Sequence, residues 1–278
     1  MSSPKEQFPG LPVATIQASK KIFIAPFKRA IGDQMDVIVR GVDFSGLEFF
    51  EEKSNSSNLS LALVTLMQYV ESLTDPQTAQ ATGARMDWKY ALHLPVHFPG
   101  LEPEILAEFR VALIAKQKAL KVFQLLLDHF AEADLLGSRG QHQVKAADVL
   151  VALCVTNQLT QLANAMNRVI EALAANQPDW LRANDSRSWL GRYGSIKSNH
   201  PLPHNRDSQV VLANNIGMDI FYLLEMIDRD CQPEIMKMQE VLLIRRIWNE
   251  QFEKLGKNSQ WKLPAKGLST AILFIKGG

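Results

Sequence analysis

The feature that most constrains this chain is a run of apolar residues spaced three and four apart. Between residues 59 and 73 this spacing places large aliphatic side chains on one face of a helix. These residues are Leu59, Leu63, Leu66, Met67, Val70 and Leu73. The same period returns at residues 105–113, 120–130, 159–173, 216–227 and 241–252. We therefore predict a mostly α fold, which 278 residues with 46% hydrophobic side chains can build around one sizeable core or two small ones.

A helix boundary follows the first run. Thr74 can cap the next helix, Gln77 can return a hydrogen bond three residues later, and Pro76 is tolerated in the first turn. This second helix is expected to reach Gly83. A third, compact helix with a basic and aromatic face is expected over residues 85–92, so the sequence predicts three closely joined helices.

Three joined helices of this kind have two interpretations. In a helix-turn-helix unit one helix enters the major groove while its neighbour rests on the phosphate backbone, and Arg85, Trp88 and Lys89 would contact backbone or bases. In a plain packing unit the basic side is incidental, because such patterns are common in all-helical domains. The spacing does not decide between DNA binding and packing.

The chain is expected to have three parts. They are an N-terminal segment with its linker at residues 1–58, a helical domain at residues 59–137 and a helix-rich region at residues 138–278. The first part has β-prone bursts at residues 21–25 and 36–39 and a polar linker at 51–58. In the last part we expect an irregular, polar connection over residues 180–207 and a β-like or irregular tail over residues 261–278.

Charge, cysteine spacing and hydropathy limit the cellular compartment and the kinds of partner that we expect. A formal net charge of +1 neither demands nor excludes a nucleic-acid partner, so any basic surface must be local. Cys154 and Cys231 have no zinc-finger or disulfide spacing, which fits a reducing cytoplasm. We find no signal-peptide core and no stretch that approaches the length of a membrane span, so export and a membrane partner are not expected.

One motif has the spacing of a metal site. His200, His204 and Asp207 would lie on one side of a helix, but Pro201 and Pro203 exclude a regular helix there. We therefore interpret the motif as a polar linker.

Two further groups were weighed as functional candidates. Arg245 and Arg246 could grip phosphate while Trp248 and Phe252 stack on bases, whereas the alternative places the aromatic rings in the core and the arginines in water. We favour the alternative.

The carboxylates of Glu102, Glu104 and Glu108 surround a helix start, where acidic side chains are favoured by the helix dipole. They are interpreted as a solvated first turn. The sequence contains no Gly-rich phosphate loop, GxSxG or HExxH motif.

Several phrases, in order, resemble bacterial DDE-type insertion-sequence transposases. Residues 61–94 (LALVTLMQYVESLTDPQTAQATGARMDWKYALHL) are similar to a leucine-rich helix followed by "LTDRQAA" and "IDWKYALGL", and residues 101–113 (LEPEILAEFRVAL) to "LSEFRARL". The resemblance continues through residues 147–173, PDWLRA at 178–183 and VLLIRRIWNEQF at 241–252. It implies a helix-turn-helix-like N-terminal domain followed by an incomplete, helix-rich remnant of an RNase H-like core.

In that family two aspartates and one glutamate hold divalent metal ions for strand cleavage and joining. The first aspartate lies in a phrase like "QRTDSTHVLAAV", and aligning its tail on residues 148–152 puts Lys145 at its position. An ammonium group repels a magnesium ion, and Asp148 is displaced by three residues, so we do not transfer the role to it. The other two carboxylates belong after the segment near Trp261, and the sequence stops at Gly278. The resemblance thus implies no catalytic residues, no metal cofactor and no strand transfer.

The resemblance also implies partners. DNA, in particular transposon inverted repeats, is expected, together with a second copy of the chain or a full-length transposase that the protein could inhibit. The alternative is a helical interaction or self-association module that has lost DNA binding, whose exposed apolar faces a partner would cover.

Overall fold

The computed structural model describes residues 8–41, 57–133, 144–184, 189–196, 202–203, 206–255 and 258–262. Within these residues the chain forms fourteen helices and one two-stranded sheet, which confirms the mostly α prediction. The chain divides into two compact units, the first ending at Leu153 and the second beginning at Cys154. The boundary expected at residues 137 and 138 lies outside the described residues.

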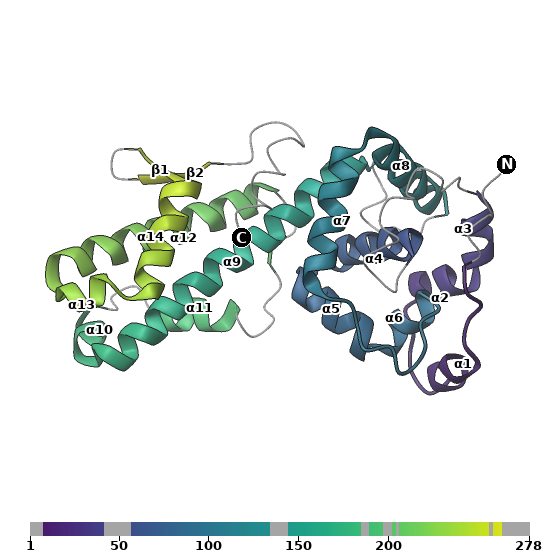
Figure 1. Ribbon diagram of the computed structural model, residues 1–278, viewed down its shortest axis with the longest axis horizontal. Helices are drawn as coiled ribbons and strands as arrows, with labels where there is room; N and C mark the ends of the chain where they lie inside the picture. The colour runs from purple at the N-terminus through teal and green to yellow at the C-terminus, as the bar shows by residue number, and fades with distance from the viewer. Residues whose placement is uncertain are drawn as a thin grey trace. The chain divides into compact units, whose positions relative to one another are not determined.

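The first unit surrounds one buried helix. Its helices are α1 (Val13–Ser19), α2 (Pro26–Asp33), α3 (Met35–Gly41), α4 (Asn58–Glu71), α5 (Asp75–Ala84), α6 (Met86–Ala91), α7 (Pro103–Ala115), α8 (Gln117–Glu132) and the first residues of α9 (Ala146–Asn176). Helix α4 lies in the middle of the unit (Figure 1), and every residue from Leu61 to Gln68 is buried. A helix that is apolar on all sides must be covered on all sides, so α4 is the centre of the core.

Capping residues set both ends of the predicted helices. Ser57 accepts a hydrogen bond from the backbone N–H of Ser60 at the start of α4, and Ser72 ends that helix in the left-handed conformation. Thr74 and Gln77 form the reciprocal capping box of α5, as predicted. Around α4 the largest buried side chains include Trp88, Phe109, Phe123 and Phe130.

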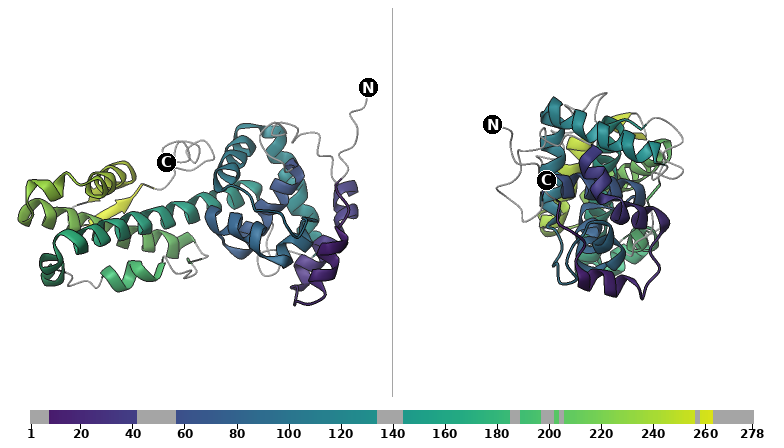
Figure 2. Two further views of the ribbon diagram at one scale, coloured as in Figure 1. Left: turned by 60° about the horizontal axis from the view of Figure 1, so that its bottom comes forward. Right: turned by 90° about the vertical axis from the view of Figure 1, so that its right-hand side faces the viewer.

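The N-terminal region is helical, which corrects the β-prone prediction. Residues 36–39 belong to α3, and residues 21–25 form the connection between α1 and α2. The sequence of α3 places Met35 and Ile38 one turn apart, and both are buried, so packing on the unit decides the local structure over β propensity. Helices α1–α3 lie together at one edge of the first unit (Figures 1 and 2). Residues 51–56 of the expected linker lie outside the described residues.

The second unit is built on the remainder of α9. It contains α10 (Pro178–Asn184), α11 (Trp189–Ile196), α12 (Arg206–Asp230), α13 (Pro233–Met236), α14 (Gln239–Gln251) and the strands β1 (Phe252–Leu255) and β2 (Asn258–Trp261). The strands pair antiparallel, with Phe252 opposite Trp261. Helices α10 and α11 occupy much of the stretch expected to be irregular, which corrects that prediction. Trp189 and Tyr193 of α11 are buried, so apolar contacts stabilise this helix. The polar residues on either side of it made the sequence look irregular.

The hairpin packs closely on α12. A Cβ added to Gly217 would lie 2.3 Å from the Phe252 ring, so only glycine permits this approach. The backbone N–H of Trp261 donates to Asn214 Oδ1 at 2.8 Å. Trp261 and Lys262 are the described start of the expected β-like tail, and residues 263–278 lie outside the described residues.

Among the helices that the structure describes, two are long and apolar enough to cross a membrane by length and composition alone, α9 and residues 207–230 of α12. The expectation that no stretch approaches this length is therefore wrong. In α9, 61% of the most apolar window is buried against the rest of the protein, and in α12 44% is buried. Core helices of soluble proteins show the same combination, so both helices are compatible with a soluble protein.

Candidate functional site

The basic and aromatic helix α6 is joined to α2 and α4 by a cluster of four charges. Lys28 Nζ of α2 lies 2.5 Å from Glu71 Oε1 and also contacts the Asp87 carboxylate. Arg85, at the start of α6, bonds Glu71 Oε2 at 2.6 Å and Asp87 Oδ2 at 2.7 Å. The Lys28 side chain is only 4% exposed. Two cations and two carboxylates therefore neutralise one another where three helices meet.

The cluster is electrostatically self-contained. Burial by itself raises the pKa of the Asp87 carboxyl, but hydrogen bonds from Arg85 and Lys28 outweigh it and hold that pKa below its usual value. Burial opposes the charge of Arg85 in the same way, and the hydrogen bonds to Asp87 and Glu71 raise its pKa. Both groups stay charged and committed to each other, so Arg85 is an ion-pair partner within the fold.

Trp88 and Lys89 face the interior. Trp88 is fully buried in the core of the first unit. Lys89 is 4% exposed, and its ammonium group donates to the carbonyl oxygens of Val96 and Phe98, the latter at 3.0 Å. Burial lowers the pKa of Lys89. These contacts correct the expectation that Trp88 and Lys89 present a DNA-facing surface, because neither side chain reaches solvent in this structure.

The N-terminal helices cover the other side of α6. Thr15 of α1 donates to the carbonyl of Leu94 at 2.8 Å, and Tyr90 donates to the carboxylate of Asp33 at the end of α2. The two ring nitrogens of His93 lie 2.9 Å from the carbonyl oxygens of Pro9 and Gly32. The N-terminal helices are thus bonded to α6 and to the residues that directly follow it.

A second buried ion pair links α5 to α7. Arg110 Nη1 donates to Asp75 Oδ1 at 2.6 Å, and its Nη2 donates to Asp75 Oδ2 at 2.5 Å. Gln68 of α4 donates to the same carboxylate at 2.7 Å. This forked geometry is the strongest form of an arginine–carboxylate contact. It fixes three helices around one buried carboxylate.

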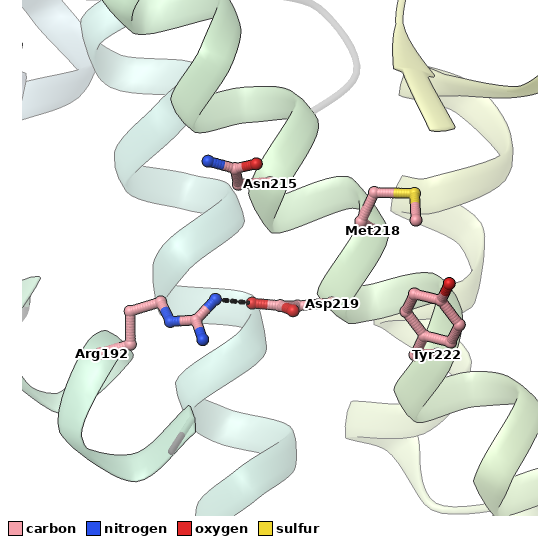
Figure 3. A pocket seen from close by; sticks show the side chains of 5 residues that line it. All are labelled: Arg192, Asn215, Met218, Asp219 and Tyr222. Carbon is pink, nitrogen blue, oxygen red and sulfur yellow. Dashed lines mark hydrogen bonds and ion pairs between the residues drawn. The ribbon is translucent and has the colours of Figure 1, made fainter. Parts of the chain in front are cut away.

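The second unit carries a pocket of about 360 Å³. Figure 3 shows its lining, which is Arg192, Asn215, Met218, Asp219 and Tyr222. Arg192 of α11 and Asp219 of α12 point toward each other (Figure 3), with 2.5 Å between Nη1 and Oδ2. The Tyr193 hydroxyl donates to Asp219 at 2.7 Å. No sequence motif indicates this pocket, because Asp219 lies 27 positions after Arg192 and 26 after Tyr193, with no motif spacing.

The carboxylate of this pocket, that of Asp219, is already engaged by hydrogen bonds from Arg192 and Tyr193. Burial and then the neighbouring Asp219 charge raise the pKa of Tyr193 far above its usual value, so the phenol stays protonated and keeps donating. Asp219 itself is buried and accepts from both partners. The geometry explains how α11 is attached to α12 and provides no activated nucleophile.

The aromatic and arginine group near α14 is divided between the interior and the surface. Phe252 is buried, and Trp248 is half-buried with its indole N–H donating to the carbonyl of Gly217 at 2.9 Å. Arg245 bonds Asp228 through both guanidinium nitrogens, at 2.6 and 2.9 Å. Arg246 is exposed. Of this group, only Arg246 presents its charge to solvent without a described ion pair.

The residues that were considered for metal binding and that the structure describes lie on the surface. Lys145 and Asp148 are exposed at the start of α9, and Asp207 is exposed in the first turn of α12. His200 and His204 lie outside the described residues. In the described part of the chain, no three His, Cys, Asp or Glu residues gather as a metal site.

The remaining candidates behave as the solvated interpretation expects. Glu102 precedes α7, Glu104 lies in its first turn, and Glu108 follows one turn later, all three exposed. Neither Cys154 nor Cys231 forms a disulfide.

Comparison with known proteins does not assign the chain to a family. No protein-family model, curated protein or solved structure matches the chain. The resemblance to transposases therefore rests on the phrases of the sequence itself.

Proposed function

We propose that the protein is a DNA-binding protein derived from a bacterial DDE-type insertion-sequence transposase, and that it does not transfer DNA strands. One observation gives this proposal its main support. Asp75 belongs to the phrase LTDPQTA and Arg110 to the phrase AEFRVAL, and these two residues form a buried ion pair across 35 positions. Both partners lie in segments that resemble the transposase family. The resemblance therefore includes residues that pack against one another in the interior of one helical unit.

The same packing changes which residues are proposed to contact DNA. Arg85 is engaged by Glu71 and Asp87, and Trp88 and Lys89 are buried, so we propose none of them as a DNA contact. Arg246 on α14 is exposed and belongs to the phrase VLLIRRIWNEQF. An exposed guanidinium suits a phosphate oxygen because its donors form a planar fork. We propose Arg246 as a backbone contact.

The absence of strand transfer is proposed from Lys145. The resemblance places this residue where the first metal-binding aspartate belongs, and its exposed ammonium group at the start of α9 would repel a divalent cation. The proposed role is to occupy inverted repeats, alone or with a full-length transposase, and so compete with the active enzyme. Two cysteines that form no disulfide are consistent with a cytoplasmic setting for that role.

A gel-shift titration tests DNA binding directly. The probe is a duplex of a terminal inverted repeat from a DDE-type insertion sequence, titrated with the full chain over a range of salt concentrations. We expect an affinity that falls steeply with salt, and Arg246→Ala should flatten the slope of log K against log salt by about 0.9. Arg168→Ala, an exposed arginine on α9, is the matched control. Equal affinity for the repeat and for unrelated duplex would contradict end recognition, and no binding would contradict the proposal.

Strand transfer is tested with the same DNA. The full chain, the repeat duplex and a target plasmid are incubated with Mg²⁺ or Mn²⁺, and joined products are sought on a gel. We expect none. A joined product would overturn the non-catalytic part of the proposal while leaving DNA binding intact.

A second candidate function is self-association. Large apolar side chains of the second unit are exposed, namely Val211, Leu242 and Leu255. A second copy of the chain would cover them. Light scattering at several protein concentrations, with and without the duplex, tests this: a monomer at all concentrations would exclude it, whereas a dimer sensitive to Leu242→Asp would support it.

A further inference from the structure

The connection between α1 and α2 exposes an aromatic ring beside two lysines. Phe23 is 85% exposed, a much higher fraction than is usual for a phenylalanine in a folded protein. Lys20 and Lys21 precede it, and Ile22 is 42% exposed between them. Ile22 and Phe23 together offer apolar surface that a partner could bury, and burial of such surface favours binding.

The residues on either side hold this connection in place. Ser19 is buried, and its hydroxyl donates to the carbonyl of Ile16 at 2.8 Å. The backbone N–H groups of Lys21 and Ile22 donate to the carbonyls of Ala18 and Ser19. Immediately after Phe23, Ile24 is buried at 3% exposure. The ring therefore projects from a turn with fixed ends, so that binding would cost little ordering of the backbone.

The charged residues that lie near Phe23 in the sequence have one sign. From Glu6 to Asp33 the sequence contains no other acidic residue, while it contains Lys20, Lys21, Lys28 and Arg29. Lys28 is neutralised by Glu71 and Asp87. Within the described residues no carboxylate pairs with Lys20 or Lys21. The exposed ring is thus bordered by cationic charge that remains uncompensated by its neighbours in the sequence.

We propose that residues 20–23 form a contact for single-stranded nucleic acid, with Phe23 stacking on an unpaired base and Lys20 and Lys21 binding the adjacent phosphates. Every base offers a flat face to an aromatic ring, and a phosphate backbone supplies the negative charge that two lysines require. A duplex hides the faces of its bases, so the single strand is the form that fits the ring. This inference rests on the proposed DNA-binding function and assigns it a surface outside the transposase-like phrases.

The experiment is an anisotropy titration of the full chain with a fluorescein-labelled 15-nucleotide oligothymidylate, and in parallel with its duplex. Phe23→Ala should weaken binding to the single strand by about 5- to 150-fold without changing the salt dependence, because stacking carries no charge. The double variant Lys20→Ala/Lys21→Ala should weaken binding and lower the slope of log K against log salt by about 1.4, which is two phosphate contacts. The duplex should respond little to Phe23→Ala.

Two matched controls separate this surface from general effects. Val37→Ala removes another exposed apolar side chain of the same region, on α3, and Lys118→Ala/Lys121→Ala removes two exposed lysines of α8. Both should bind the single strand as the unaltered chain does. Circular dichroism should show the same helicity for every variant, because all the altered side chains are exposed.

The possible outcomes test the contact at residues 20–23 separately from the proposed DNA-binding function. If the unaltered chain binds either DNA and the variants at residues 20–23 bind equally well, the surface is wrong and the proposed DNA-binding function stands. If the unaltered chain binds neither probe, both are wrong. Sedimentation with vesicles of 30% phosphatidylserine tests the competing partner: Phe23-dependent binding to vesicles without Phe23-dependent binding to the oligonucleotide would assign the ring to a membrane surface and overturn the inference.

Discussion

At the scale of the residue, charged side chains of the transposase-like phrases stabilise the interior. Arg110 is 2% exposed and bonds both oxygens of Asp75, whose carboxylate also accepts from Gln68. Removing one partner of a buried ion pair leaves an uncompensated charge in the interior, which is strongly destabilising. Arg110 is therefore a more critical residue for the fold than any of its exposed cationic neighbours.

Replacing Arg110 should expose that dependence. Arg110→Met keeps much of the length of the side chain and removes its charge, which leaves Asp75 buried without its main partner. We expect a loss of about 3–5 kcal/mol in the free energy of unfolding, measured by urea titration with circular dichroism. Lys118→Met, a substitution of an exposed lysine on α8, should change it by less than about 0.5 kcal/mol. Equal stability of the two variants would show that the Asp75 pair is dispensable.

At the scale of the element, α5 depends on its cap more than its neighbours do. It has few large apolar residues, and its sequence is DPQTAQATGA. Thr74 and Gln77 supply the reciprocal hydrogen bonds that start it, at 3.4 and 2.9 Å. Thr74→Ala should lower the free energy of unfolding by about 1 kcal/mol, measured as a shift of the urea midpoint. Thr160→Ala, inside α9, is the control, because alanine favours a helix interior; a comparable loss there would argue against a capping effect.

The elements also show which features a sequence can predict. Periodic apolar residues and the capping box were sufficient for α4 and α5, because a helical face and a helix start are local patterns. The helix α3 was not predicted, because its β-branched residues suit a strand and only packing of Met35 and Ile38 decides otherwise. The sequence also marked Arg85 as basic but could not show that Lys28, 59 positions before Asp87, joins Arg85, Glu71 and Asp87 in a neutral cluster. Pairs formed by tertiary contact have no spacing signature.

At the scale of the whole molecule, the chain has two compact units, and their boundary falls inside α9. The core of the first unit is one connected cluster that ends at Leu153. The second has its own fully buried residues, including Ile220 of α12 and Val241 of α14. Each unit therefore has enough apolar material of its own for substitutions in the two cores to act separately.

Calorimetry of the full chain can test that separation. Leu63→Ala in α4 and Ile220→Ala in α12 each remove buried methyl groups, and each should cost about 2–5 kcal/mol. We expect Leu63→Ala to lower the temperature of one unfolding transition, Ile220→Ala that of another, and the double variant both, with effects that add within about 0.5 kcal/mol. Leu125→Ala on the exposed side of α8 is the control and should move neither transition. If either buried substitution shifts both transitions equally, the two cores unfold as one cooperative body, and α9 is then the element that couples them.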